Sequence, residues 1–246
     1  MMRRAGDILA RCFIAVEPMV ADGVATRDID SFVSEFFRRE GAIASFLGVE
    51  GAVRGQKPYP ASVCISINEE VIHGIPGKRR IKGGDVVSLD IGAIYKGYHS
   101  DMARTYCVGD APQVGRRLAR AAEECFWRGV EAAKPGGRVP DISRRVQRSA
   151  QAEGFSVVRD YTGHGIGREM HEAPQVPNFD DGVGLGARLR PGMTLAVEPM
   201  VNAGGAEVET LPDKWTVVTR DRALSAHYEN TILICDGEAR ILSAPV

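Results

Sequence analysis

Two stretches of the chain share one pattern of side chains, and each ends on a carboxylate. They are Ile81–Asp90 and Leu189–Glu198: each starts with an apolar and a basic residue, passes a glycine and continues as an apolar run up to the acid. An acid flanked by apolar residues is drawn toward the protein interior, where an isolated charge is costly. The duplication therefore makes Asp90 and Glu198 candidate functional residues.

The repeat extends to histidines on both sides of each copy. A His-Gly-Ile triplet precedes each copy, starting at His73 and at His164, and a His-x-acid triplet follows each one, at His99–Asp101 and at His227–Glu229. Chance could give one such match, but three matching parts in the same order indicate two related halves around a pseudo-twofold axis.

The duplication yields four carboxylates: Asp90, Asp101, Glu198 and Glu229. Taken singly, each acid is best explained as a solvated strand end or as one partner of a salt bridge. Buried together, the four would repel one another and raise their own pKa values unless a countercharge is present. Divalent cations supply that charge, and a site rich in oxygen ligands with a single imidazole suits Mn, Fe, Co or Zn. The duplicated acids therefore predict a metal centre.

The histidines of the chain all lie in or beside these motifs. Glycines surround His164, and they allow close backbone approach and place an imidazole at a cleft rather than in a core. His171 follows a short distance along the chain. His99 and His227 are interpreted as structural, because a lone histidine is more often a hydrogen-bonded structural group than a ligand.

The elements that must position these residues are a mixture of helices and strands. Helices are predicted over residues 26–40, 112–133 and 141–153. Strands are predicted over residues 62–67, 85–94 and 98–108. Thr26 is the expected cap of the first helix and Gly41 its end, and Lys96–Gly97 turns the last two strands into a hairpin. From Phe155 onward the chain is expected to form strands and glycine-rich loops, and without a linker-like segment it is predicted to be one domain, 1–246.

The composition is that of a globular protein, with 246 residues, 44 % hydrophobic and 26 % charged. With 31 basic and 32 acidic side chains the net charge is −1, which argues against a nucleic-acid partner. The longest apolar run, Cys12–Val16, is far shorter than the about 20 residues of a membrane helix, so no membrane partner is expected. Five scattered cysteines without a Cys-x-x-Cys spacing exclude a zinc finger and predict reduced thiols and a cytoplasmic protein.

The duplicated acids and histidines, with the segments around them, resemble those of the bacterial type I methionine aminopeptidases, which belong to the pita-bread metallopeptidases. The matching stretches span essentially the whole chain: Ser66–Pro76, Asp90–Asp101, Gly163–Gly167, Val197–Met200 and Tyr228–Glu229. The resemblance implies an α+β pita-bread (creatinase/aminopeptidase) fold, with two pseudo-symmetric halves around a central antiparallel sheet. It also implies a metal-dependent aminopeptidase that removes the initiator methionine of nascent polypeptides when the second residue is small.

Carried over position by position, the resemblance implies two divalent ions (Co, Mn, Fe or Zn) bound by Asp90, Asp101, His164, Glu198 and Glu229. Asp101 and Glu229 would bridge both ions. Asp90 would bind one ion, and His164 with Glu198 would bind the other. Two ions about 3.5–4 Å apart can share a water and polarise a scissile carbonyl, and Glu198 is implied as the base for that water.

Other residues are implied to contact the substrate. His171 would steady the carbonyl oxygen, and His73 would contact the peptide nitrogen next to the scissile bond. The pocket for the methionine side chain would include Tyr59, Cys64 and Trp215, for which the sequence alone favours ordinary core packing.

Two residues depart from the family pattern, and two further residues match a minor feature of it. Gln56 stands where many relatives carry an aromatic residue, and Met170 stands where some carry Phe, so the pocket is expected to differ while the metal ligands are intact. Asn68 and Ser225 match positions that bind a monovalent cation in relatives.

Two alternative functions have to be weighed. One is a proline-specific dipeptidase or aminopeptidase of the same fold, which usually carries an additional N-terminal domain. The other is a non-enzymatic binding module of this fold, which would have lost metal ligands that are present here. The basic residues Lys78–Arg80 and Lys82 could contact ribosomal RNA near emerging chains, although a solvated loop is the favoured interpretation.

Overall fold

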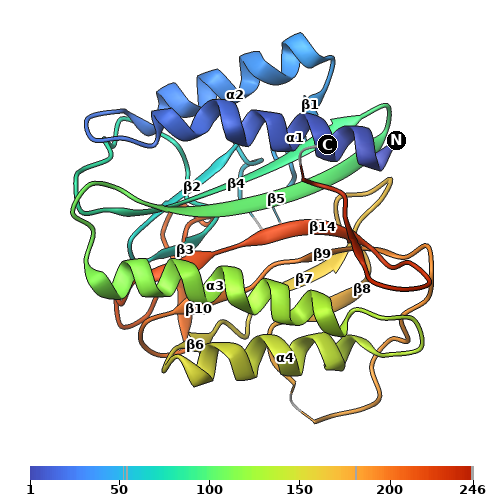
Figure 1. Ribbon diagram of the computed structural model, residues 1–246. Helices are drawn as coiled ribbons and strands as arrows, with labels where there is room; N and C mark the ends of the chain where they lie inside the picture. Colours follow the sequence, from blue (N-terminus) through green and yellow to red (C-terminus); the bar gives the residue numbers. More distant parts are fainter. Residues whose placement is uncertain (52, 54, 181, 245–246) are drawn as a thin grey trace.

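The computed structural model describes residues 1–51, 53, 55–180 and 182–244 (Figure 1). The helices are α1 (Met2–Val16), the short 3-10 helix η1 (Glu17–Met19), α2 (Thr26–Glu40), α3 (Gln113–Ala132) and α4 (Val139–Ala152). The strands of the first part of the chain are β1 (Ile43–Ala44), β2 (Cys64–Ile67), β3 (Glu70–Ile72), β4 (Val86–Tyr95) and β5 (Tyr98–Cys107). Those of the second part are β6 (Ser156–Val157), β7 (Thr162–Gly165), β8 (Glu172–Pro177), β9 (Thr194–Val197), β10 (Met200–Asn202), β11 (Val208–Thr210), β12 (Val217–Thr219), β13 (Ser225–His227), β14 (Glu229–Leu233) and β15 (Arg240–Ile241).

Nine of the described strands form one antiparallel sheet with the order β1-β4-β5-β14-β9-β7-β8, in which β2 also pairs with β4 and β15 with β14. This order is symmetric about the central β5–β14 pair, which β4 flanks on one side and β9 on the other. The strands of the repeat therefore occupy equivalent places, which confirms the predicted fold with two pseudo-symmetric halves around a central antiparallel sheet.

Each half of the sheet has its own pair of helices. Helices α1 and α2 lie over the β4–β5 half, and α3 and α4 lie over the β14–β9 half (Figure 1). Two separate apolar cores result, one around Leu89 and Ile91 of β4 and the other around Phe126 of α3. Because burial of apolar surface is the dominant favourable term in folding, each helix pair stabilises its half of the sheet. The opposite face of the sheet is not covered by these helices.

Helix α1 was not predicted, although its sequence carries the signal. Ile8, Leu9, Cys12 and Phe13 fall at helical spacing and are all buried. The charged side chains Arg4 and Arg11 lie outside this buried face of the helix. Arg11 there donates two hydrogen bonds of 2.7 Å to Glu40 at the end of α2.

The other predicted elements are present, with small differences at their ends. The N-cap of α2 is Ala25 rather than Thr26, because the Thr26 hydroxyl donates to the Gly77 carbonyl at 3.2 Å and accepts from the Gly77 amide at 2.8 Å. The hairpin is as predicted: Lys96 and Gly97 both have positive φ, as a two-residue type I′ turn requires. Asp90 lies inside β4, which continues to Tyr95, in agreement with the strand predicted over residues 85–94.

None of the five cysteines forms a disulfide, as expected. Among the described helices, none combines the length and the apolar character that a membrane crossing requires.

Candidate metal centre and active site

Alternation along the central strands separates apolar from acidic side chains. On β4, Leu89 and Ile91 are buried in the core beneath α1 and α2, so Asp90 between them points to the opposite face of the sheet. Asp101 of β5, Glu229 of β14 and Glu198, which directly follows β9, point into the same space. These four acids line one small cavity of about 110 Å³ on the face that the helices leave free.

The strand register explains why acids far apart in sequence meet. Asp90 pairs with Ala103 across β4–β5, and Ala103 pairs with Glu229 across β5–β14. Asp90 and Glu229 therefore lie in one row on either side of β5, with Asp101 a short step along that central strand. Each half of the repeat thus contributes one acid from the central β5–β14 pair and one from, or directly after, the strand beside that pair.

The electrostatics of this cluster favour a bound cation. Burial, followed by the repulsion of the neighbouring acids, raises the pKa of Asp90, Glu198 and Glu229 well above the usual range. Burial also raises the pKa of Asp101 to about 7. Four carboxylates cannot all be ionised here without a positive charge among them.

The nearest imidazole is neutral and has the tautomer of a metal ligand. Burial lowers the pKa of His164 to about 4, so the ring does not supply the missing charge. Its Nδ1 lies 2.8 Å from the Gly165 carbonyl oxygen, which can only accept, so Nδ1 carries the proton. Nε2 is then left with its lone pair 3.4 Å from Oε1 of Glu198. A histidine that donates its other nitrogen to a backbone carbonyl is the usual arrangement at a metal site.

Buried polar atoms without partners test whether a metal fits. Among the described residues, Asp90 Oδ1, Glu229 Oε1 and His227 Nε2 are buried and have no hydrogen-bond partner. Such atoms are rare, because each lost hydrogen bond costs about 1–3 kcal/mol. Ligand atoms come within 4.8 Å of one another in two groups: Asp101, His164 and Glu229, and Asp90, His227 and Glu229. The oxygen and nitrogen donors fit a divalent metal.

The two histidines interpreted as structural differ in their contacts: a ring nitrogen of His99 is hydrogen bonded, whereas Nε2 of His227 has no hydrogen-bond partner among the described residues. Nδ1 of His99 lies 3.0 Å from the Ser45 hydroxyl. His227 is 1 % exposed, and its Nε2 lies 3.7 Å from Oε2 of Glu229 and 3.9 Å from Oε2 of Glu198. These two distances are too long for hydrogen bonds.

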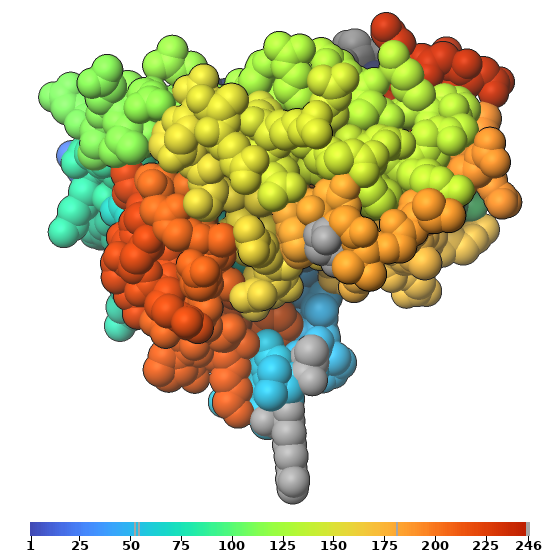
Figure 2. Space-filling model, turned by 90° about the horizontal axis from the view of Figure 1, so that it is seen from below, coloured from blue at the N-terminus to red at the C-terminus, as the bar shows by residue number. Residues whose placement is uncertain are grey.

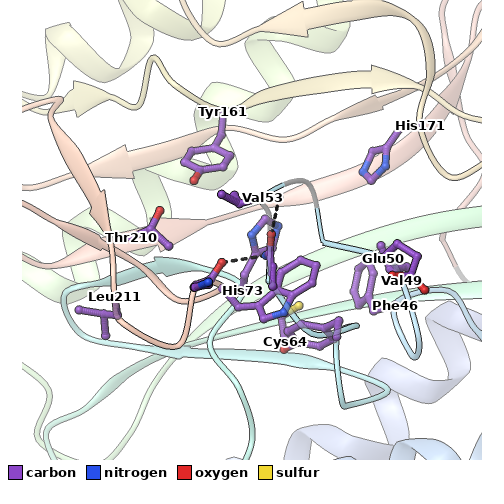
Figure 3. Close-up of a pocket in the computed structure, with 14 residues that line it drawn as sticks. Phe46, Val49, Glu50, Val53, Cys64, His73, Tyr161, His171, Thr210 and Leu211 are labelled. Atoms are coloured by element: carbon purple, nitrogen blue, oxygen red, sulfur yellow. Dashed lines mark hydrogen bonds between the residues drawn. The ribbon is translucent and has the colours of Figure 1, made fainter.

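A larger cavity of about 570 Å³ adjoins the acids. Phe46, His73, Tyr161 and His171 line both cavities, so they stand at the boundary between them. Figure 3 shows Tyr161 and His171 on one side of this space and Phe46 and Cys64 on the other. The His171 ring centroid is 4.4 Å from that of His164. Burial lowers the pKa of His171 and lowers that of His73 to about 4, so both rings are neutral near pH 7.

The three predicted pocket residues lie together in the wall of the larger cavity. The rings of Tyr59 and Trp215 meet edge to face with centroids 5.2 Å apart, and Trp215 is 6.1 Å from His73. Cys64 pairs with Asp90 across β2–β4, so the pocket and the acid cluster share one strand pair. The Tyr59 hydroxyl donates to the Gly74 carbonyl at 2.9 Å, so the ring is fixed.

The two residues that depart from the family pattern occupy different cavities. Gln56 lines the larger one, and its side-chain amide donates to the Lys214 carbonyl at 2.8 Å. The indole of Trp215 donates to the Lys57 carbonyl at 2.9 Å, so the loop around residue 50 (cyan in Figure 2) lies beside the segment around residue 210 (orange). Met170 lines the smaller cavity with the acids.

Several cavity residues were missed from the sequence. They are Phe46, Val49, Tyr161, Thr210 and Leu211, which belong to loops or strand ends outside the recognised motifs. Phe46 and Tyr161 line both cavities, yet nothing in the spacing around them distinguishes them from core residues.

The candidate residues for a monovalent cation are neighbours. The Ser225 amide donates to the Asn68 carbonyl at 2.8 Å. The Asn68 side chain bonds Asp85 at 2.9 Å, and the Ser225 hydroxyl bonds Asn202 at 2.9 Å. Their side chains are therefore engaged within the protein, and the Asn68 carbonyl oxygen accepts the Ser225 amide.

Comparisons with known proteins identify the family of the chain. The model of metallopeptidase family M24 matches residues 1–236. A methionine aminopeptidase of Clostridium perfringens is 47 % identical over 243 residues, which cover 99 % of this chain and 94 % of that protein. Methionine aminopeptidase 1 of Bacillus subtilis is 44 % identical over 242 residues, covering 98 % and 94 %.

Solved structures give the same result. The methionine aminopeptidase of Thermotoga maritima superimposes with a TM-score of 0.92 at 41 % identity, covering 98 % of this chain and 94 % of that one. Prolidase from Pyrococcus furiosus superimposes with a TM-score of 0.78 at 23 % identity, and the chain covers 63 % of it, so this likeness concerns the fold alone. The chain belongs to metallopeptidase family M24, and within it to the type I methionine aminopeptidases.

Proposed function

We propose that this chain is a metal-dependent aminopeptidase that removes the N-terminal methionine of proteins whose second residue is small. The observation that carries the proposal is the adjacency of two cavities: a small one lined by four acids, of which three are buried, and a larger one lined mainly by apolar and aromatic side chains. A metal-binding centre beside an apolar pocket is what cleavage next to one apolar side chain requires.

The proposed metal ligands are Asp90, Asp101, His164, Glu198 and Glu229, holding two divalent ions of the Co, Mn, Fe or Zn kind. Four of them are buried and belong to the groups of close ligand atoms, and Asp90 and Glu229 carry unpartnered oxygens. Glu198 is partly buried and is supported by the cavity that it lines and by its distance of 3.4 Å from Nε2 of His164. When bound, the ions supply Lewis acidity toward water and toward the scissile carbonyl. The substrate's free amine is the third group that this centre would bind, which restricts cleavage to chain ends.

Glu198 is the proposed base. Its carboxylate oxygens lie 3.4 Å from Nε2 of His164 and 3.9 Å from Nε2 of His227, and it lines the cavity where the attacked carbonyl would sit. In this role it accepts a proton from the attacking water and returns it to the leaving amine.

His171 and His73 are the proposed contacts to the reacting peptide. Both are neutral near pH 7 and line both cavities, so a peptide that spans the boundary between them meets these rings. The His171 N–H donates to the carbonyl oxygen, where negative charge develops. His73 contacts the peptide nitrogen on the other side of the scissile bond.

The pocket proposed for methionine is bounded by Tyr59, Cys64 and Trp215. Thioethers pack well against aromatic rings, and two of these three residues are aromatic. We also propose a monovalent cation at the positions of Asn68 and Ser225.

The proposed partners are the N-termini of nascent polypeptides in the cytoplasm, met near the ribosomal exit. The basic residues Lys78–Arg80 and Lys82 are the candidate ribosome contact. Arg79 is paired with Glu70 of the same chain at 2.7 Å, which favours a solvated loop over an RNA-binding surface.

Methionine release from the tripeptide Met-Ala-Ser tests the proposal, with Met-Lys-Ser as the matched control. We expect release from the first peptide only, loss of activity after chelation, and recovery with Co²⁺ or Mn²⁺. Hydrolysis of Ala-Pro in place of Met-Ala-Ser would indicate the proline-specific alternative. No hydrolysis with any of Co²⁺, Mn²⁺, Fe²⁺ and Zn²⁺ would indicate a binding module.

A further inference from the structure

We propose that His227 is a metal ligand of this centre, binding through Nε2 the ion that Asp90 and Glu229 hold. The inference rests on the metal centre of the proposed function. It gives a role to a side chain outside the five ligands that the sequence implied.

The unpartnered atoms identify the site. The three buried polar atoms without a hydrogen-bond partner among the described residues come from Asp90, His227 and Glu229. The same three residues form one of the two groups whose ligand atoms lie within 4.8 Å of one another. Two independent properties, missing partners and mutual proximity, therefore select one set of residues from three different strands.

The distances leave room for an ion between the ligand atoms. Nε2 of His227 is 3.7 Å from Oε2 of Glu229, beyond hydrogen-bond range. Metal–ligand bonds of about 2.0–2.2 Å place two ligand atoms of the same ion about 3–4 Å apart. Because His227 is 1 % exposed, solvent does not satisfy this nitrogen. An ion shared with Asp90 and Glu229 does.

The backbone holds His227 in this orientation. The Thr105 hydroxyl accepts from the His227 amide at 2.9 Å and donates to the His227 carbonyl at 2.8 Å. The Tyr228 amide then donates to the Pro199 carbonyl at 3.2 Å, between β13 and β14. His227 and Glu229 are two residues apart in this extended segment, so their side chains leave it on the same face.

The equivalent histidine of the other half is a natural control. His99 precedes Asp101 by the same spacing, but its ring bonds the Ser45 hydroxyl at 3.0 Å and is partly exposed. The repeat therefore offers two histidines in equivalent sequence positions, of which one faces the metal centre.

A second imidazole changes the donor set. With His227 included, each of the two ligand groups contains one histidine, His164 in one and His227 in the other. Nitrogen donors favour Co²⁺ and Zn²⁺ over Mn²⁺, which prefers oxygen ligands. The Asp90 side of the centre is thus expected to discriminate against Mn²⁺ more strongly than a site of carboxylates alone.

Calorimetric titration of the metal-free full chain with Co²⁺ and with Mn²⁺ tests this, comparing the parent protein, His227→Gln and His99→Gln. We expect two Co²⁺ per parent chain. His227→Gln should weaken one of them by about 10-fold or more and change Mn²⁺ binding less. His99→Gln should match the parent. Two Co²⁺ bound to His227→Gln with parental affinities would overturn the inference and leave the proposed function intact, whereas no Co²⁺ on the parent would overturn the metal centre itself.

A second measurement does not depend on the folding of a variant. In the Co²⁺-loaded parent, each ligating imidazole gives a paramagnetically shifted, exchangeable N–H proton signal in the NMR spectrum. We expect two such signals, of which His227→Gln loses one and His99→Gln none. A single signal in the parent would refute the assignment of His227.

Discussion

The two halves of the repeat place their equivalent acids in the same way, but they place their equivalent histidines differently. Asp90 and Asp101 of the first half and Glu198 and Glu229 of the second all reach one cavity. Among the histidines, His73 lines the larger cavity beside Trp215, whereas its counterpart His164 stands against Glu198. The sheet fixes the acids, while the loops around the histidines were free to diverge.

The glycine that follows each of these histidines shows what did not diverge. A Cβ on Gly74 would lie 2.2 Å from the Ile65 carbonyl oxygen, and a Cβ on Gly165 would lie 2.4 Å from that of Ala173. At both glycines the backbone therefore lies very close to a neighbouring backbone segment. The close backbone contact is thus kept in both halves, whereas the histidine beside it has a different environment in each.

The largest expected effect is the loss of a central acid, which tests whether both halves are equally necessary. Asp101→Ala removes a carboxylate from the β5–β14 pair at the axis of the repeat. Its loss reduces the negative charge available to bind metal, so activity should vanish and metal content should fall together. The exposed Asp110→Ala is the control, and metal analysis with the Met-Ala-Ser assay provides the measurement. Full metal content in Asp101→Ala would contradict the ligand assignment.

The next effect separates a substrate-contacting histidine from a ligand. His171→Ala should lower kcat by about 10²–10³, equivalent to about 3–4 kcal/mol of transition-state stabilisation. Metal content should stay at the parental level and KM should change less than kcat, because His171 contacts only the reacting carbonyl. His164→Ala, in contrast, should lose metal. If His171→Ala emptied the site, the two roles would have to be exchanged.

The glycine comparison predicts a smaller, purely structural effect in both halves. Gly74→Ala and Gly165→Ala should each reduce the free energy of unfolding by about 1–3 kcal/mol, since backbone must shift to admit the new methyl group. Gly77→Ala has open space and is the control. Urea unfolding of all three variants supplies the measurement. If Gly165→Ala left the free energy of unfolding unchanged while Gly74→Ala reduced it, the two glycine positions would not be equivalent.

The smallest expected effect is a pH dependence of the metal-free protein. The pKa of Asp101 is raised to about 7 from an ordinary value of 3.8, so between these values the folded state binds the additional proton and stability falls as pH rises. His164, whose pKa is lowered from 6.5 to about 4, acts oppositely below pH 6.5. The histidine effect fades above about pH 7.5, where imidazoles are neutral in the unfolded state as well. There the acids dominate, at most about 1.4 kcal/mol per pH unit for each proton.

Thermal unfolding between pH 6.5 and 8.5 measures this effect. The metal-free protein should lose stability over this range, and Asp101→Asn should lose less. The Co²⁺-loaded protein should show a flatter profile, because ligated carboxylates are already ionised. A metal-free protein that gained stability over the same range would contradict the burial of these acids as neutral groups.

Much of the framework could be predicted from the sequence because it depends on local patterns. The hairpin of β4 and β5 follows from Lys96–Gly97, and the acids follow from the repeat. Helix α1 was missed because only its longest apolar run was considered, whereas its buried residues follow helical spacing over the whole segment.

The parts that could not be predicted depend on contacts between distant segments. Nothing in the triplets around His99 and His227 tells them apart; the difference arises because Ser45 reaches one ring and no described residue bonds Nε2 of the other. Phe46 and Tyr161 likewise become cavity residues only when the loops that carry them meet across the sheet.

The position of the metal centre on the β5–β14 seam has an evolutionary consequence. Each half supplies two acids, so neither half alone can surround an ion. A shorter ancestral chain with only one half could complete such a centre by pairing with a second copy across a twofold axis, in an isologous dimer. Duplication and fusion would then have released each copy of the histidine motif from symmetry, so that one could face the metal while the other came to face the substrate.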